Sequence, residues 1–228
     1  MRNPLKIGHR GAKNHIAENT LESVKQALEL GVDGIEIDVH RCASGELVVF
    51  HDFTLDRMTN GSGEIAKHTL LELQQLQVEG QFSIPTLEEV LNVVDKACVI
   101  NIELKGKQTA EETCRILDDY INSHGWNYDQ FIISSFQSHE LETVYKTHKN
   151  LRLGVLTKAS VSDAIEIANS VNAFAIHPNM ALITKTNVAY AQELGYKVIV
   201  WTVNDEVAIT RMKSYGVDGI ISDNPERL

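Results

Sequence analysis

Two carboxylates and a histidine in the stretch 34–52 (GIEIDVHRCASGELVVFHD) have the residue types and the spacing for chemistry. Glu36 and Asp38 stand two residues apart in an apolar run, and His51 follows a second apolar run in the same stretch. An acidic side chain inside a strand loses its hydration unless a partner meets it there. We therefore expect a divalent cation beside the two carboxylates, with the histidine supplying proton transfer.

A third carboxylate falls on a later apolar run, 99–104. Side chains alternate between the two faces of a strand, so Glu36 and Asp38 share one face, and Glu103 and Lys105 share a face of the later strand. Three carboxylates converge if these strands are neighbours. Ligation by oxygen alone favours Mg²⁺ or Ca²⁺ over zinc, which usually recruits His or Cys. Salt bridges at a barrel rim would explain the same acids without a metal.

Two histidines end predicted strands and should face the same mouth. His9 ends the run 5–9, and His51 ends the run that begins at Leu47. An unperturbed imidazole titrates near neutrality, so two of them beside a scissile bond could act as base and acid. A structural role at a strand end is the alternative. His177 also ends a strand, but no carboxylates accompany it, so it is a weaker candidate.

Cations and aromatic residues complete a possible anion site. Arg10 and Lys105 would lie at the same mouth, and Arg is suited to bidentate contact with phosphate. Trp201 could pack against an apolar or glycerol-like part of a ligand, although a core tryptophan is an equal alternative, and Phe136 has a similar but weaker claim. The protein as a whole is acidic, so any positive field must be local.

The elements that must position these residues alternate between strand and helix. Apolar, β-rich runs separated by helical segments lie at 5–9, 34–39, 99–104, 131–136, 151–156, 173–176, 197–203 and 219–222. About eight such units predict a TIM (β/α)₈ barrel, in which the chemistry sits at the carboxyl ends of the strands. No linker rich in Pro, Gly or Ser divides the chain, so we expect a single domain over 1–228.

The run 47–50 departs from this alternation. It follows the second strand after too few residues for a parallel crossover and must turn back as a β-hairpin. With the turn centred between Ser44 and Gly45, Asp38 would lie opposite His51. The segment 53–85 then forms an insertion beside the presumed site. We expect it to be a lid or rim that contributes to substrate choice, unless it merely plugs a barrel end.

Composition narrows the class of protein. A formal net charge of -10, without a Lys/Arg-rich run, argues against a nucleic-acid partner. The three cysteines lie in no C-x-x-C spacing, which predicts reduced thiols. Residues 1–9 lack an apolar secretory signal, and no apolar run approaches the ~18 residues needed to span a bilayer. We expect a cytoplasmic protein that acts on a small molecule without stable membrane association; the oligomeric state stays open.

Seven short motifs occur along nearly the whole chain. They are HRG (9–11), ENT (18–20), EIDV (36–39), VFHD (49–52), IPTL (84–87), NIELK (101–105) and WTVN (201–204). Their order and spacing resemble those of the glycerophosphodiester phosphodiesterase family. The resemblance implies a TIM barrel with an insertion after the His-Asp motif. It also implies hydrolysis of glycerophosphodiesters, such as glycerophosphocholine and glycerophosphoethanolamine, to sn-glycerol 3-phosphate and an alcohol.

Position by position, the resemblance implies that Glu36, Asp38 and Glu103 bind the metal. His9 and His51 match the acid/base pair. One histidine would remove the proton of the glycerol 2-hydroxyl as it attacks phosphorus, and the other would protonate the leaving alcohol. The metal would hold a phosphate oxygen and lower the pKa of that hydroxyl. Water would then open the cyclic phosphate with the histidine roles reversed.

The resemblance also covers two basic residues and one loop position. Arg10 and Lys105 match phosphate-binding positions and would offset charge on the phosphoryl oxygens. Ala17 stands where the family often has proline, which changes loop stiffness and leaves the catalytic groups intact.

Three alternative functions stay open. A related barrel phosphodiesterase acting on lysophospholipids, of the lysophospholipase D type, is one alternative. A glycosidase using Glu36 and Glu103 would leave both histidines without a role. A non-catalytic barrel that binds glycerol phosphate is the remaining alternative.

Overall fold

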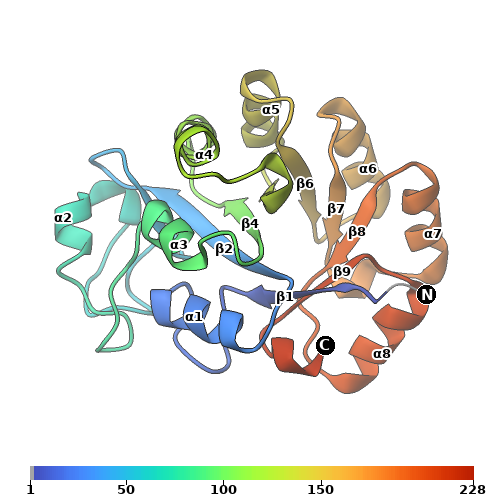
Figure 1. Cartoon of the computed structure of the whole chain (residues 1–228), viewed down its shortest axis with the longest axis horizontal. Coiled ribbons are helices and arrows are strands. Elements are labelled where there is room, and N and C mark those ends of the chain that lie inside the picture. Colours follow the sequence, from blue (N-terminus) through green and yellow to red (C-terminus); the bar gives the residue numbers. More distant parts are fainter. Residues whose placement is uncertain (1–2) are drawn as a thin grey trace.

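Eight parallel strands close into a barrel in the computed structural model, which describes residues 3–228 (Figure 1). In spatial order they are β1 (Leu5–His9), β2 (Gly34–Arg41), β4 (Val99–Leu104), β5 (Phe131–Ser135), β6 (Arg152–Thr157), β7 (Ala175–Pro178), β8 (Lys197–Val200) and β9 (Gly219–Ser222). Because β1 pairs with both β2 and β9, the sheet closes on itself. The predicted TIM barrel is confirmed.

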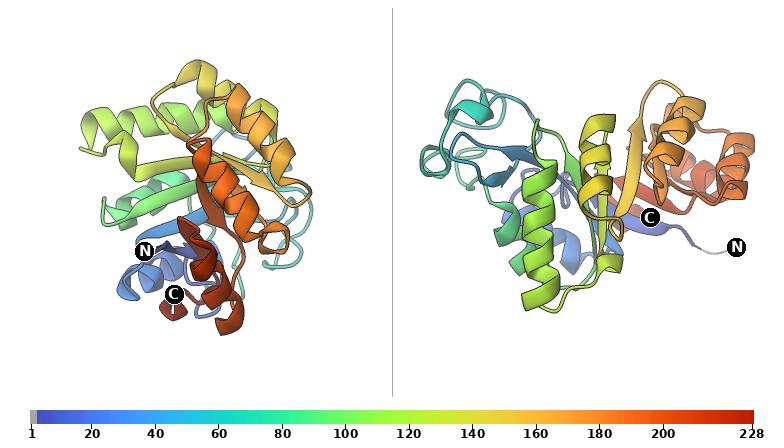
Figure 2. Two further views of the ribbon diagram at one scale, coloured as in Figure 1. Left: turned by 90° about the vertical axis from the view of Figure 1, so that its right-hand side faces the viewer. Right: turned by 90° about the horizontal axis from the view of Figure 1, so that it is seen from above.

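Helices connect successive barrel strands and cover the outside of the barrel (Figures 1 and 2). They are α1 (Leu21–Glu29), α3 (Leu87–Val94), α4 (Ala110–Ser123), α5 (Ser138–Thr147), α6 (Val161–Ser170), α7 (Lys185–Glu193) and α8 (Glu206–Tyr215). Local sequence sets their starts. Thr86, for example, accepts a hydrogen bond from the backbone N–H of Glu89, whose carboxylate accepts one from the backbone N–H of Thr86 in return. No helix within residues 3–228 combines the length and the apolar character needed to cross a membrane.

The alternation of side chains separates two environments in the barrel. In β4, Ile100 and Ile102 pack in the large hydrophobic cluster shared with the helices, whereas Asn101 and Glu103 line the cavity on the inner side. Deeper in the interior lies a small apolar cluster formed by Ile7, Ile132, Ala175, Ile199 and Ile221. Polar inward-facing residues therefore gather toward the carboxyl ends of the strands, above an apolar plug.

The hairpin is present, but its predicted register is wrong by one residue. β3 (Leu47–Val49) pairs antiparallel with β2, and Val39 faces Val49. The backbone N–H of Phe50 donates to the carbonyl of Asp38 at 3.0 Å, so Asp38 lies opposite Phe50 and not His51. The cause is a three-residue connection, 43–45, that ends in Gly45 at φ 110°. Such loops contain a residue with positive φ, which glycine adopts without strain.

The insertion 53–85 contains two short helical turns, η1 (Ile65–Lys67) and α2 (Leu70–Leu73), and lies at one side of the barrel beside β2 (Figures 1 and 2). It builds a separate hydrophobic cluster with the outer part of the hairpin. The fully or nearly fully buried members of this cluster include Val48, Phe50, Leu55, Ile65, Leu73 and Ile84. The insertion is therefore packed against the hairpin that carries His51.

Candidate active site

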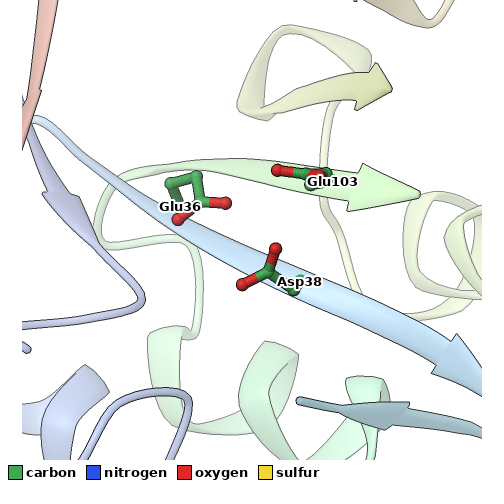
Figure 3. Close-up of side chains that lie close together, drawn as sticks. All are labelled: Glu36, Asp38 and Glu103. Atoms are coloured by element: carbon green, nitrogen blue, oxygen red, sulfur yellow. The ribbon is translucent and has the colours of Figure 1, made fainter. Parts of the chain in front are cut away.

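Three carboxylates converge at the carboxyl end of the barrel. Glu36 and Asp38 project from the same face of β2, and Asp38 lies directly opposite Glu103 of β4 in the parallel register. One oxygen of each carboxylate lies within 4.8 Å of the others, and all three residues are buried (Figure 3). The sequence placed these acids together through strand alternation, and the structure brings them together.

Burial and mutual repulsion shift the carboxyl pKa values. Burial and the charge of Asp38 raise the pKa of Glu36 well above its ordinary value. The same two causes raise the pKa of Glu103 to about 7. Burial also opposes ionisation of Asp38, but Arg10 and Lys105 reverse that effect and lower its pKa. A buried acidic cluster of this kind is costly without positive charge.

The donor set suits a hard divalent cation. All the ligating atoms are carboxylate oxygens, as Mg²⁺ and Ca²⁺ prefer. Asn101 adds another oxygen beside the cluster, since it lies opposite Glu36 in the register and lines the same cavity. Its buried Oδ1 has no hydrogen-bond partner within residues 3–228, while its Nδ2 donates to Ser134. The residues therefore fit such an ion, and the oxygens alone do not choose between the two metals.

Arg10 and Lys105 stand beside the carboxylates, as predicted. The backbone N–H of Arg10 donates to Glu36 Oε2 at 3.0 Å, and the Arg10 Nε lies 3.3 Å from Asp38 Oδ2. Lys105 Nζ donates to Glu103 Oε1 at 2.9 Å. Arg10 has φ 52°, and Gly11 follows at φ 87°; this tight turn at the end of β1 directs the Arg10 backbone N–H to the cluster.

His9 is held by the carboxylate of Asp223, the residue that follows the last barrel strand. Its Nδ1 lies 2.5 Å from Oδ1 of Asp223, and Asn204 donates to the other oxygen of Asp223 at 2.8 Å. The His9 Nε2 lies on the side of the cluster, 3.9 Å from Glu36 Oε2. Burial lowers the pKa of His9, and the hydrogen bond to Asp223 offsets part of that effect. A neutral imidazole with an oriented Nε2 can accept a proton.

His51 has the same arrangement on another wall of the cavity. Its Nδ1 lies 2.6 Å from Asp52 Oδ1, and Arg57 donates to both oxygens of Asp52 at 2.5 and 3.0 Å. Burial lowers the pKa of His51, and the charge of Asp38 acts in the opposite direction. Each of the two histidines therefore uses Nδ1 for a carboxylate and leaves Nε2 available. Arg57 belongs to the insertion, so the insertion reaches this site through Asp52.

A cavity of about 440 Å³ joins these groups. Its polar side includes His9, Arg10, Glu36, His51, Asn101, Glu103 and Lys105. On the opposite side lie five residues that we call the far wall: Phe136, Leu156, Lys158, Asn179 and Trp201. Trp201 donates from Nε1 to the carbonyl of His177 at 2.7 Å. The rings of Phe136 and Trp201 pack edge to face, with their centroids 5.6 Å apart.

A larger hollow of about 590 Å³ lies beside the hairpin and has a different lining. It is bordered by hairpin residues, by Phe53 and Glu64 of the insertion, and by the loop after β4. None of the predicted site residues borders it. The insertion lines this hollow and contributes no residue to the lining of the 440 Å³ cavity, so an expected role in substrate choice would have to be indirect.

His177, the weaker candidate, lies outside the cavity lining. It is fully buried, and neither ring nitrogen has a hydrogen-bond partner within the described part of the chain. A Cβ on Gly154 would lie 2.6 Å from its Nε2, so glycine is required there for the ring to fit. Burial lowers the pKa of His177 to about 3. The residue is a neutral core histidine in this structure.

Sequence reasoning missed several polar residues at the site. Asp223 follows β9 directly, and its place in a SDN triplet after a buried run was the available signal. Asn19 donates to Asp38 at 2.9 Å, and Glu18 accepts from Arg10 at 2.7 Å. Both residues belong to the ENT motif, to which the sequence assigned no role. Lys158 was missed because the predicted strand stopped at Leu156, one residue before the observed end of β6.

The comparisons with known proteins agree with this geometry. Residues 9–227 match the model of the glycerophosphoryl diester phosphodiesterase family. A glycerophosphodiester phosphodiesterase of Caldanaerobacter subterraneus is 36% identical, over 98% of this chain and 96% of its own length. One from Bacillus altitudinis is 33% identical, over 97% and 95%. A phosphodiesterase of Oleispira antarctica, solved with the product sn-glycerol-3-phosphate, is 31% identical with a TM-score of 0.89, and the match covers 99% of this chain and 95% of that one.

Proposed function

The chain belongs to the glycerophosphoryl diester phosphodiesterase family, and on that basis we propose that it hydrolyses glycerophosphodiesters to sn-glycerol 3-phosphate and an alcohol, using a divalent cation and two histidines. Its activity as a phosphodiesterase is common to its named relatives. The finer statement is supported most by one observation. His9 and His51, each held by a carboxylate at Nδ1, line the same cavity as the three acids.

Glu36, Asp38 and Glu103 would hold the cation, either Mg²⁺ or Ca²⁺. When bound, it would supply Lewis-acid stabilisation of negative charge and lower the pKa of a coordinated hydroxyl. The raised pKa values of Glu36 and Glu103 support this assignment, because a bound cation would offset the burial and the repulsion by Asp38 that raise them.

His9 and His51 would divide the proton transfers between them. One would take the proton of the glycerol 2-hydroxyl at its Nε2, and the other would give a proton from its Nε2 to the leaving alcohol. The cyclic phosphate formed by that attack would then be opened by water, with the roles reversed. Asp223 and Asp52 would keep each ring in the tautomer and orientation that these transfers need.

Arg10 and Lys105 would bind phosphoryl oxygens, although both now contact carboxylates in the same cavity. Trp201 and Phe136 line this cavity and would pack against an apolar or glycerol-like part of the substrate. The Oleispira protein carries sn-glycerol-3-phosphate as its product, which supports a small glycerophosphodiester as the substrate here. We also propose that the protein works in the cytoplasm, because its cysteines are free thiols, which suit a reducing compartment.

Two other functions remain as proposals of lower rank. A lysophospholipid substrate would use the same polar side but needs an apolar surface for its acyl chain. A barrel that binds glycerol phosphate without turnover would not need two oriented histidines. The deciding experiment is an assay of chelator-treated protein on glycerophosphocholine and glycerophosphoethanolamine, with Mg²⁺ or Ca²⁺ restored separately. Release of glycerol 3-phosphate only after a metal is restored is expected; equal release under full chelation would contradict the metal assignment.

A further inference from the structure

The far wall carries one charged residue. Phe136, Lys158, Asn179 and Trp201 each follow directly after the barrel strands β5, β6, β7 and β8, and Leu156 lies within β6. Carboxyl ends of neighbouring strands meet at the same end of a barrel, which explains why these residues share one wall. No carboxylate belongs to this part of the cavity lining, so Lys158 is the charge that a ligand would meet there.

Lys158 also differs from the other cations of the cavity. Arg10 lies 3.3 Å from Asp38 Oδ2, and Lys105 donates to Glu103 at 2.9 Å. Lys158, by contrast, makes no ion pair or hydrogen bond with any group in residues 3–228, and its side chain is exposed. An amine without a protein carboxylate is available to an anionic group of a ligand.

One of the two aromatic rings of the far wall, that of Phe136, already has two lysine ammonium groups against it. The Nζ atoms of Lys158 and Lys105 each lie 5.9 Å from the centroid of the Phe136 ring. The face of a phenyl ring attracts cations, so this ring would otherwise offer a favourable contact to a cationic headgroup. A second cation, brought by the substrate, would meet two positive charges at that ring.

We propose that Lys158 is a specificity-determining residue that makes the enzyme favour diesters whose alcohol carries a negative charge over diesters whose alcohol is cationic. The proposal rests on the proposed function, because it takes the 440 Å³ cavity as the place of hydrolysis. The glycerol is uncharged and the phosphodiester is common to all substrates of the class. Discrimination by charge must therefore act on the alcohol.

The test uses three glycerophosphodiesters with two-carbon alcohols that differ in charge: glycolate, ethanol and ethanolamine. The kcat/KM of each is measured at low and high salt for the unmodified enzyme and for Lys158→Met and Lys158→Glu. Lys107→Met is the matched control, since it removes an exposed lysine that lines the other hollow and not this cavity. We expect the glycolate diester to exceed the ethanolamine diester by roughly fivefold at low salt, and this ratio to shrink at high salt.

Lys158→Met should bring the three kcat/KM values together, Lys158→Glu should reverse their order, and Lys107→Met should leave the order unchanged. Equal kcat/KM for all three diesters in the unmodified enzyme would overturn the proposal. A uniform loss for all three in Lys158→Met would also overturn it, because the amine would then serve the common phosphate. If none of the three diesters released glycerol 3-phosphate, the proposed function itself would be contradicted.

Discussion

His9 and Asp223 meet across the seam that closes the barrel: Nδ1 of the histidine lies 2.5 Å from Oδ1 of the aspartate, although 214 positions separate them in the chain. The pairing of β1 with β9 brings the two strand ends together. His51 has an equivalent partner in its neighbour Asp52, at 2.6 Å. One histidine is thus oriented by barrel closure and the other by the hairpin.

Replacing Asp223 by Asn tests the first of these pairs. The variant keeps the shape of the side chain but removes the charge that fixes the His9 ring, so we expect kcat to fall about 10²-fold with little change in KM. Asp218→Asn is the control, because it removes a carboxylate just before β9 that pairs with Lys197 instead. A loss confined to KM, or an equal loss in the control, would show that Asp223 does not act through His9.

Metal binding should be visible as stability. Adding Mg²⁺ or Ca²⁺ to chelated protein should raise Tm, because a ligand at about 100 times its Kd stabilises the folded state by about 3 kcal/mol. For a domain of this size that corresponds to roughly 5–10 °C. Scanning calorimetry of the unmodified protein and of Glu103→Gln measures the effect. The shift should be lost in the variant; an undiminished shift would place the ion elsewhere.

His177 should make stability depend on pH. Its pKa is about 3 in the folded state, against an ordinary value of about 6.5 when unfolded. Between these values the unfolded chain binds one proton more, so this group's contribution is complete above about pH 6.5 and is lost progressively as pH falls. Between pH 8 and pH 5, His177 should lower the free energy of unfolding by about 2 kcal/mol.

Urea unfolding of His177→Met, compared with the unmodified protein at pH 8 and pH 5, measures that contribution. The variant should lose about 2 kcal/mol less on acidification. His139→Gln, which removes an exposed histidine of α5, should behave like the unmodified protein. If all three proteins lost the same free energy of unfolding between pH 8 and pH 5, the low pKa of His177 in the folded state would be contradicted.

The leaving alcohol can identify which histidine is the acid. A diester with p-nitrophenol as the alcohol needs no protonation on departure, whereas the choline diester does. We expect either His9→Ala or His51→Ala, but not both, to recover most of its lost rate of alcohol release on the p-nitrophenyl substrate. Equal loss on both substrates for both variants would contradict a division of labour between base and acid.

The barrel and the acidic cluster could be predicted because they follow from local regularities. Strand alternation with period two fixes that Glu36 and Asp38 share a face, and the parallel register then brings Glu103 beside them. The hairpin register failed because it depended on whether the turn holds two or three residues, which apolar patterning does not specify. A shift of one residue moved Asp38 from His51 to Phe50.

The residues that contact the site residues could not be predicted from the sequence, for a different reason. Asp223 meets His9 only because the barrel closes, a contact that no local pattern encodes. Lys158 enters the cavity because β6 extends to Thr157, and strand ends are the least certain part of a prediction from sequence. The insertion was expected near the site, and its link to His51 runs through Arg57 and Asp52.

The central claim is that two oriented histidines carry the proton transfers while the carboxylates hold the metal. The most direct measurement is kcat of His51→Ala on glycerophosphocholine, with the affinity for Mg²⁺ and Ca²⁺ measured by calorimetry on the same preparation. We expect kcat to fall about 10³-fold or more and the metal affinity to stay nearly unchanged, since His51 is not among the proposed ligands Glu36, Asp38 and Glu103. Near-normal turnover in this variant would contradict the account.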